Sequence, residues 1–96
     1  MTFTFHPLAS AELDEVIQYY ETYERGMGMA FLEEAYSAIR RICIYPAACP
    51  AASANTRKCI LNRFPYALMY QIKDGNVRII AFAHLRRRPG YWTRRA

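Results

Sequence analysis

The sequence predicts an α+β fold, a two-layer domain in which a helical hairpin packs on an antiparallel C-terminal sheet in the order β-α-α-β-β-β. Three observations predict it: helical apolar spacing in the first half, strand-like apolar runs in the second, and a hairpin turn signal between the last two runs. The 96 residues suffice for a single domain spanning 1–96. With 53% hydrophobic and 22% charged residues, the chain has the composition of a protein with an ordinary buried core.

The first half of the chain predicts one short strand followed by two helices. Residues 2–6 alternate phenylalanine with polar residues, which indicates a strand that Pro7 stops. Residues 9–23 carry apolar side chains at helical spacing, and Ser10 is the expected N-cap. After a break at Gly26 and Gly28, the same spacing resumes at Phe31 and continues toward residue 45. We therefore expect an antiparallel pair of helices joined by a glycine turn.

The second half predicts a loop and three strands. Residues 46–55 are small and aperiodic, whereas residues 58–64, 66–73 and 77–85 are rich in strand-forming side chains. Asp74 and Gly75 predict a two-residue hairpin turn, because both positions of the favoured turn need a positive φ. The helices should cover one face of this sheet and leave a basic face opposite. Strict alternation in the last strand would place Arg78, Ile80, Phe82 and His84 on one face and Val77, Ile79, Ala81 and Ala83 on the other.

Charge is divided unevenly along the chain. Residues 1–54 hold three Lys/Arg and seven Asp/Glu, a net charge of −4, whereas residues 55–96 hold ten Lys/Arg and one acid, a net charge of +9. A basic half on a small domain favours a polyanion or an acidic protein as partner. A solvated basic face that serves only solubility is the alternative.

Other features exclude several classes of protein. The three cysteines lack the paired spacing of a zinc site and are odd in number, so we expect reduced, mostly buried thiols, no metal site and no cofactor. Charges and prolines interrupt every apolar run before it reaches the roughly 18 residues of a membrane span. The N-terminus shows no signal-peptide pattern, which predicts a cytoplasmic protein without a membrane partner.

Several motifs together resemble the RelE/ParE superfamily of toxins from bacterial type II toxin–antitoxin systems. The C-terminal half carries Arg63-Phe-Pro-Tyr-Ala-Leu-Met-Tyr70 and then Ala83-His-Leu-Arg-Arg-Arg-Pro-Gly-Tyr-Trp92. The early His-Pro pair, the helical Tyr-Tyr-Glu and Gly28-Met-Ala-Phe-Leu32 also fit, so the similarity covers nearly the whole chain. Arg88 departs from the pattern, since relatives often have an acidic residue there.

The resemblance implies the toxin of a plasmid-stabilisation type module, neutralised in a heteromeric complex by a cognate antitoxin. Two targets are open, because members of one fold differ in function. ParE-like members inhibit DNA gyrase and have no recognisable catalytic set, which this chain matches better. RelE-like members are mRNA interferases that cleave mRNA on the ribosome. A third possibility is a nucleic-acid-binding module without toxicity, and growth inhibition on expression would argue against it.

Four residues would serve the ribonuclease function. Metal-free cleavage by a 2′-hydroxyl needs proton-transfer groups and cations that stabilise the phosphorane. His84 and Tyr91 are the candidates for proton transfer, and Arg63 and Arg87 are candidate phosphate ligands. The structural alternatives are a hydrogen-bonded His84 and aromatic residues that pin the tail to the sheet. Phosphate or target contacts are further expected from Arg57, Lys58, Arg86, Arg88 and Trp92.

The helical hairpin supplies the predicted surface for the antitoxin. Tyrosines on both sides of the first helix and two methionines beside the glycine turn suit a protein interface, although methionine also adapts to packing within a core. The residues expected to contact the antitoxin are Tyr19, Tyr20, Tyr23, Met27 and Met29.

Overall fold

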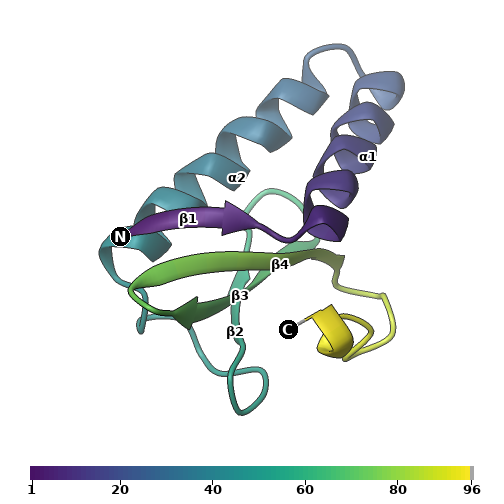
Figure 1. Cartoon of the computed structure of the whole chain (residues 1–96). Coiled ribbons are helices and arrows are strands. Elements are labelled where there is room, and N and C mark those ends of the chain that lie inside the picture. Colours follow the sequence, from purple (N-terminus) through teal and green to yellow (C-terminus); the bar gives the residue numbers. More distant parts are fainter. Residues whose placement is uncertain (96) are drawn as a thin grey trace.

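Two helices lie across one face of a four-stranded mixed sheet in the computed structural model, which describes residues 1–95 (Figure 1). The strand order is β1-β4-β3-β2, with β1 parallel to β4 and the other neighbours antiparallel. This confirms the predicted α+β class and element order. The elements are β1 (Thr2–Phe5), α1 (Pro7–Tyr23), α2 (Met27–Ile44), β2 (Arg57–Ile60), β3 (Tyr66–Lys73), β4 (Asn76–His84) and a 3-10 turn η1 (Thr93–Arg95).

Helix α1 begins earlier than predicted and has a different cap. His6 is extended, and its ring Nδ1 accepts a hydrogen bond from the Leu8 amide at 3.0 Å. Pro7 occupies the first helical position, where its missing amide hydrogen costs nothing. The proline therefore ends β1 and starts the helix at once, and Ser10 lies inside the first turn instead of capping it.

The glycine turn between the helices is held by Glu21. Its carboxylate accepts hydrogen bonds from the amides of Gly26 and Gly28 at 3.0 Å, and so binds the free amides at the start of α2. Gly26 has a φ of 87°, a left-handed conformation that favours glycine. At Gly28, α2 lies so close to α1 that a Cβ there would be 2.6 Å from the Ile17 carbonyl oxygen.

Strand β2 is shorter than the predicted strand 58–64. Leu61 donates its amide to the Tyr66 carbonyl at 2.9 Å, so the chain is already turning back after Ile60. The Glu34 carboxylate on α2 accepts hydrogen bonds from the amides of Asn62 and Arg63. The helix layer thereby binds backbone groups that a longer strand would have paired in the sheet.

The hairpin between β3 and β4 confirms the predicted turn, because Asp74 and Gly75 both have positive φ. The side of the sheet on which the β4 side chains lie, however, differs from the prediction. The pairing register shifts between Met69 and Tyr70, which pair with Ala81 and Ile79, so Ile80 is an inserted residue. As a result Val77, Ile79 and Phe82 face the helices, whereas Ile80, Ala81 and Ala83 face the opposite side.

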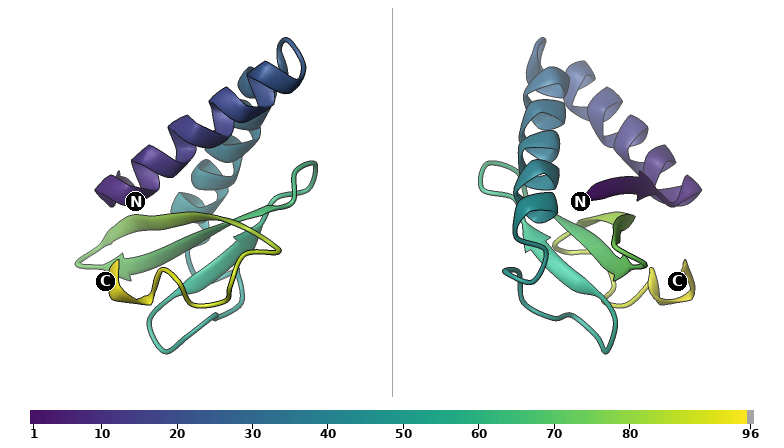
Figure 2. Two further views of the ribbon diagram at one scale, coloured as in Figure 1. Left: turned by 90° about the vertical axis from the view of Figure 1, so that its right-hand side faces the viewer. Right: turned by 60° about the vertical axis from the view of Figure 1, so that its left-hand side comes forward.

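The face of the sheet away from the helices is covered by the chain's own C-terminal tail. Figure 2 shows residues 85–95, in yellow-green to yellow, running under the sheet on the side opposite α1 and α2. Trp92 is 7% exposed and packs in a second apolar cluster with Ala67, Met69, Ile80, Ala81 and Ala83. The face that was expected to be basic therefore has apolar side chains at its centre and cations at its rim. Neither helix within residues 1–95 has the length and apolar composition that crossing a membrane requires.

Candidate functional site: a cleft between the sheet and the C-terminal tail

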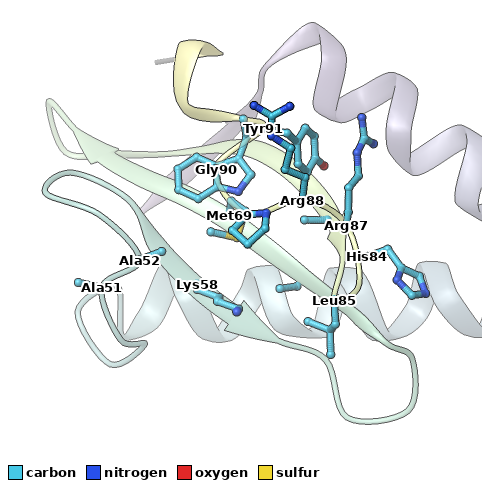
Figure 3. Close-up of a pocket in the computed structure, with 14 residues that line it drawn as sticks. Ala51, Ala52, Lys58, Met69, His84, Leu85, Arg87, Arg88, Gly90 and Tyr91 are labelled. Atoms are coloured by element: carbon cyan, nitrogen blue, oxygen red, sulfur yellow. The ribbon is translucent and has the colours of Figure 1, made fainter.

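A cleft of about 330 Å³ lies between the sheet and the tail. Its floor is apolar and comes from β3 and β4, with Ala67, Met69 and Ala83. Its rim carries four groups that can bear positive charge. Figure 3 shows Lys58 on β2 at one side and the tail arginines at the other. The rim groups are Lys58, His84, Arg87 and Arg88.

One wall of the cleft is the tail, and a carboxylate on helix α1 holds it in place. Glu12 accepts hydrogen bonds from the Tyr91 hydroxyl and from both terminal nitrogens of Arg95, all at 2.9 Å. A two-pronged guanidinium–carboxylate contact of this kind is among the stronger polar interactions in proteins. Both side chains are only 12% exposed, so water screens the pair little. The Arg87 guanidinium lies 3.7 Å from the same carboxylate.

Glu12 and Arg95 meet here because β1 is short. Beyond Ile79, whose carbonyl accepts the His6 amide, β4 continues without a strand on that edge. Glu12 accepts the Phe82 amide at 3.0 Å, and Arg95 donates to the Ile80 carbonyl at 3.0 Å. The two side chains therefore satisfy edge groups of β4 and bind each other across the gap.

Sequence reasoning missed both residues. Glu12 was one of several acids near the start of a predicted helix, and Arg95 one of several terminal cations. No motif or spacing singles either out, because the partner of each is more than 80 residues away. The only signal in the sequence is the division of charge, which predicts attraction between the halves without naming a pair.

The environment of Tyr91 disfavours proton transfer. Burial, then the charge of Glu12 and the hydrogen bond to it, raise the pKa of the Tyr91 hydroxyl to about 12. Arg87 lies 3.7 Å above the ring centre, a cation–π contact. The Tyr91 hydroxyl therefore donates its proton in a hydrogen bond to Glu12. The Arg87 guanidinium contacts both the Tyr91 ring and the Glu12 carboxylate.

His84 ends β4 with its ring in two structural contacts. Its Nδ1 accepts the Arg86 amide at 3.0 Å, and the ring stands edge-on to Tyr66 at 5.0 Å between centroids. Because Nδ1 is an acceptor, Nε2 carries the hydrogen of the neutral ring. His84 lines the cleft as well as a smaller cavity of about 230 Å³ beneath α1. Residues 85–90 form turns and bends after β4, so strand geometry does not set the directions of Arg86, Arg87 and Arg88.

Two of the predicted cations lie outside the cleft. Arg63 is in the turn between β2 and β3, where its guanidinium contacts the Met27 sulfur at 3.6 Å and lies 5.5 Å from the Phe64 ring centre. Arg57 donates to the carbonyls of Cys49 at 2.6 Å and Ala47 at 3.2 Å, so it supports the loop before β2. The structure therefore leaves Arg63 and Arg57 apart and groups the other predicted residues at one cleft, namely Lys58, His84, Arg87, Arg88, Tyr91 and Trp92.

The remaining predicted residues divide by exposure. Trp92 lines the cleft but is mostly buried in the second apolar cluster, whereas Arg86 and Arg88 are exposed on the tail. On the helical hairpin, Tyr19, Tyr23 and Met29 are 62%, 76% and 58% exposed. The other two interface candidates, Tyr20 and Met27, are partly buried against the main core.

Chemically, the cleft can bind an anion above an apolar floor. Lysine and arginine at its rim suit phosphate or carboxylate groups, and the floor suits an apolar or planar portion of the bound molecule. Within residues 1–95, no three side chains of the His, Cys, Asp and Glu types gather as a metal-binding group.

Comparison with known proteins points to one family. Residues 3–89 match the family described as "ParE toxin of type II toxin-antitoxin system, parDE". Among solved structures, the chain is similar to one described as the "Chromosomal ParDE TA system from P. aeruginosa", with a TM-score of 0.74 and 16% identity. That match covers 88% of this chain and 95% of the other, and at this identity it shows a shared fold. No curated protein matches the sequence.

Proposed function

The chain belongs to the ParE toxin family of type II toxin–antitoxin systems, and we propose that it inhibits DNA gyrase by binding it, without chemistry of its own. The observation that carries this proposal is the state of the four candidate catalytic groups. The Tyr91 hydroxyl is bound to Glu12, and its pKa is raised to about 12. Arg63 lies in another turn, in contact with Met27.

The cleft is the proposed contact surface for the target. Its rim cations Lys58, Arg87 and Arg88 attract an acidic protein surface or the DNA that gyrase holds. Arg86 adds charge beside the cleft from the exposed tail. The tail that carries these arginines is fixed by Glu12, so the cations are already in position before binding, and ordering them costs less on association.

The outer surface of the helical hairpin is the proposed site for a neutralising antitoxin. Tyr19, Tyr23 and Met29 are exposed there, and aromatic side chains with methionine are enriched in protein interfaces. The hairpin also carries most of the acidic residues, so this surface differs in charge from the cationic cleft. An antitoxin bound at the hairpin and a target bound at the cleft would contact opposite layers of the molecule.

A RelE-like ribonuclease is the second candidate, and one observation favours it. Lys58, His84 and Arg87 line the same cleft as Tyr91, which gives a phosphate several cations and one imidazole. For this function Tyr91 would have to leave Glu12 when RNA binds. His84 would then be the principal proton-transfer group, because its Nε2 is the nitrogen not used by the backbone.

The test uses purified chain, purified gyrase and relaxed plasmid. We expect loss of supercoiling and accumulation of cleaved DNA, both weakened by Lys58→Glu or Arg88→Glu, which reverse charge at the rim of the cleft. Lys73→Glu is the matched control, because Lys73 is exposed at the far end of β3 and does not line the cleft. Unimpaired supercoiling at a large molar excess of the folded chain would contradict the proposal.

Expression in a bacterium separates the alternatives. Gyrase inhibition predicts DNA breaks and a damage response before protein synthesis stops, whereas ribonuclease action predicts mRNA cut on ribosomes and early arrest of translation. Co-expression of the adjacent gene should restore growth if it encodes the antitoxin. Unaffected growth on expression would instead favour a nucleic-acid-binding module without toxicity.

A further inference from the structure

The loop before β2 contains a short stretch that runs antiparallel to β2. Ala51 forms a bridge with Arg57, the Lys58 amide donates to the Pro50 carbonyl at 3.0 Å, and the Ala52 amide donates to the Thr56 carbonyl at 2.7 Å. These bonds flank the Ala51–Arg57 position on both sides. They identify it as a non-hydrogen-bonded pair, the kind in which facing side chains are closest.

Cys49 precedes Ala51 by two residues and Cys59 follows Arg57 by two residues, so the antiparallel bridge brings both cysteines to the same end of the paired stretch. The Arg57 guanidinium donates to the Cys49 carbonyl at 2.6 Å and so holds the bend that contains Cys49 beside β2. The Cys49 side chain is a hydrogen-bonding neighbour of the Cys59 thiol, which is the kind of proximity that a disulfide requires. Both cysteines pack in the same apolar core cluster, Cys59 at 8% exposure and Cys49 partly buried at its edge.

The electrostatics of the region agree with this placement. Burial, followed by the neighbouring Cys49 thiol, raises the pKa of Cys59 to about 11. Burial also raises the pKa of Tyr70, with a hydrogen bond to Cys49 as the next cause. Arg57 reaches back to the Cys49 carbonyl, and Tyr70 donates to the Pro46 carbonyl at 2.7 Å. Polar contacts therefore hold the loop with Cys49 against β2.

We propose that Cys49 and Cys59 are a redox modification site that closes to a disulfide on reaction with a peroxide. The Cys49 thiolate attacks one oxygen of hydrogen peroxide, which breaks the O–O bond and gives a sulfenic acid and hydroxide. The Cys59 thiol then attacks that sulfur and forms the S–S bond, and its proton leaves with the sulfenic hydroxyl as water. The proton that Cys49 released on forming its thiolate neutralises the hydroxide. Two thiols are oxidised, one peroxide is reduced, and two waters form.

The disulfide would tether the loop to β2 beside the cleft. Ala51 and Ala52 form one wall of the cleft, two and three residues after Cys49, and Lys58 precedes Cys59. The disulfide would restrict the conformations of the loop that forms this wall and would lower the conformational entropy of the unfolded chain. The inference concerns thiol chemistry and does not depend on the identity of the toxin's target.

The experiment exposes the folded chain to a small excess of hydrogen peroxide and counts free thiols after denaturation. We expect three thiols before treatment and one after it, with the intact mass lower by two hydrogens and full recovery with dithiothreitol. Trypsin releases Cys59 in peptide 59–63, whereas Cys43 and Cys49 share peptide 42–57. Cys43→Ser resolves this ambiguity, because a cross-link between these peptides in that variant must involve Cys49.

Two variants complete the test. Cys49→Ser and Cys59→Ala should each abolish the cross-link, and circular dichroism checks that they fold. The proposal is overturned if folded Cys43→Ser forms no cross-linked peptide, if the link in the unaltered chain joins Cys43, or if the bond forms between two molecules. Sulfinic acid on single cysteines, without a link, would overturn it as well.

Discussion

At the scale of single residues, Glu12 connects three separate parts of the chain through its carboxylate. Its carboxylate receives four hydrogen bonds from Phe82, Tyr91 and Arg95, and so joins helix α1, the edge of β4 and the tail. Its side chain is only 12% exposed, so water competes little for these hydrogen bonds. The same contacts determine what Tyr91 can do, because a hydroxyl that donates to a carboxylate gives up its own proton reluctantly.

The raised pKa of Tyr91 predicts a high-pH titration step. Absorbance of tyrosinate, followed in the unaltered chain and in Tyr91→Phe, should differ by one group that titrates near pH 12 instead of 10. Between these values the unfolded chain loses the proton and the folded chain keeps it, so the free energy of unfolding falls as pH rises from 10 to 12. Tyr23→Phe, which removes an exposed hydroxyl, should leave that step in place. If the titration step that Tyr91→Phe removes has its midpoint near pH 10, the contact between Tyr91 and Glu12 is contradicted.

At the scale of elements, the length of β1 and the bulge in β4 decide where the functional groups lie. Because β1 pairs only as far as Ile79, the rest of β4 has a free edge that Glu12 and Arg95 occupy. The inserted Ile80 reverses the facing of the residues after it. Phe82 therefore joins the main core, and Ala83 joins the floor of the cleft.

Close crossing of the two helices gives an element-scale prediction at Gly28. Gly28→Ala adds a Cβ that would lie 2.6 Å from the Ile17 carbonyl oxygen and 3.0 Å from Glu21, so the hairpin must open or shift. Alanine favours the helix by about 1 kcal/mol, but overpacking costs roughly 1–3 kcal/mol, and the clash with backbone makes destabilisation the net result. Urea unfolding measures it, with exposed Glu33→Ala on the same helix as control. A Gly28→Ala variant as stable as the unaltered chain would show that the helices have room to separate.

At the scale of the whole molecule, the division of charge along the sequence becomes a division between layers. The acids lie mostly on α1 and α2, and the cations lie mostly on the sheet and tail. The structure brings the two together at Glu12, where the tail is bound, and leaves cations at the rim of the cleft. Charge attraction therefore helps bind the tail to helix α1, and the positive potential of the remaining cations can attract an anionic partner.

Docking of the tail predicts how the molecule unfolds. Trp92 is the single tryptophan, so its fluorescence reports the tail, whereas far-ultraviolet circular dichroism reports mainly the helices. In the unaltered chain the two urea transitions should coincide. Glu12→Gln weakens the charged hydrogen bonds and should cost roughly 2 kcal/mol, with the fluorescence transition moving to lower urea than the dichroism transition.

The matched control for this prediction is Glu15→Gln, which removes the same charge from an exposed position one turn along α1. It should leave both transitions within about 0.5 kcal/mol of the unaltered chain. If the fluorescence and dichroism transitions of Glu12→Gln coincide, at the same urea concentration as in the unaltered chain, the packing of Trp92 alone holds the tail.

Much of the fold follows from local patterns. The helical hairpin, the order of elements along the chain and the turn at Asp74 and Gly75 were predicted and are confirmed, because side-chain periodicity and turn chemistry act over a few neighbouring residues. The start of α1 was predicted too late, since the capping ring of His6 was not considered. The facing of β4 was wrong, because a bulge leaves no mark in the pattern of apolar residues.

The candidate site was predictable only as a list of residue types. The closing motif directed attention to Arg87 and Tyr91, which do lie at one cleft with Lys58 and His84. The same reasoning placed Arg57 and Arg63 with them, although each is engaged elsewhere by backbone carbonyls or by Met27. Which cations converge depends on where turns direct them, and sequence spacing alone does not contain that information.

The sequence by itself therefore determined the fold class, the excess of positive charge in the second half and the resemblance to RelE/ParE toxins. Each of these rests on local propensity, on composition or on motifs read along the chain. Only the tertiary structure decided that Glu12 holds the tail, that Ile80 reverses the facing of the residues after it, and that Cys49 and Cys59 pack in one cluster. These are contacts between distant or looped segments, and their partners are selected by packing of the whole chain and not by its neighbouring residues.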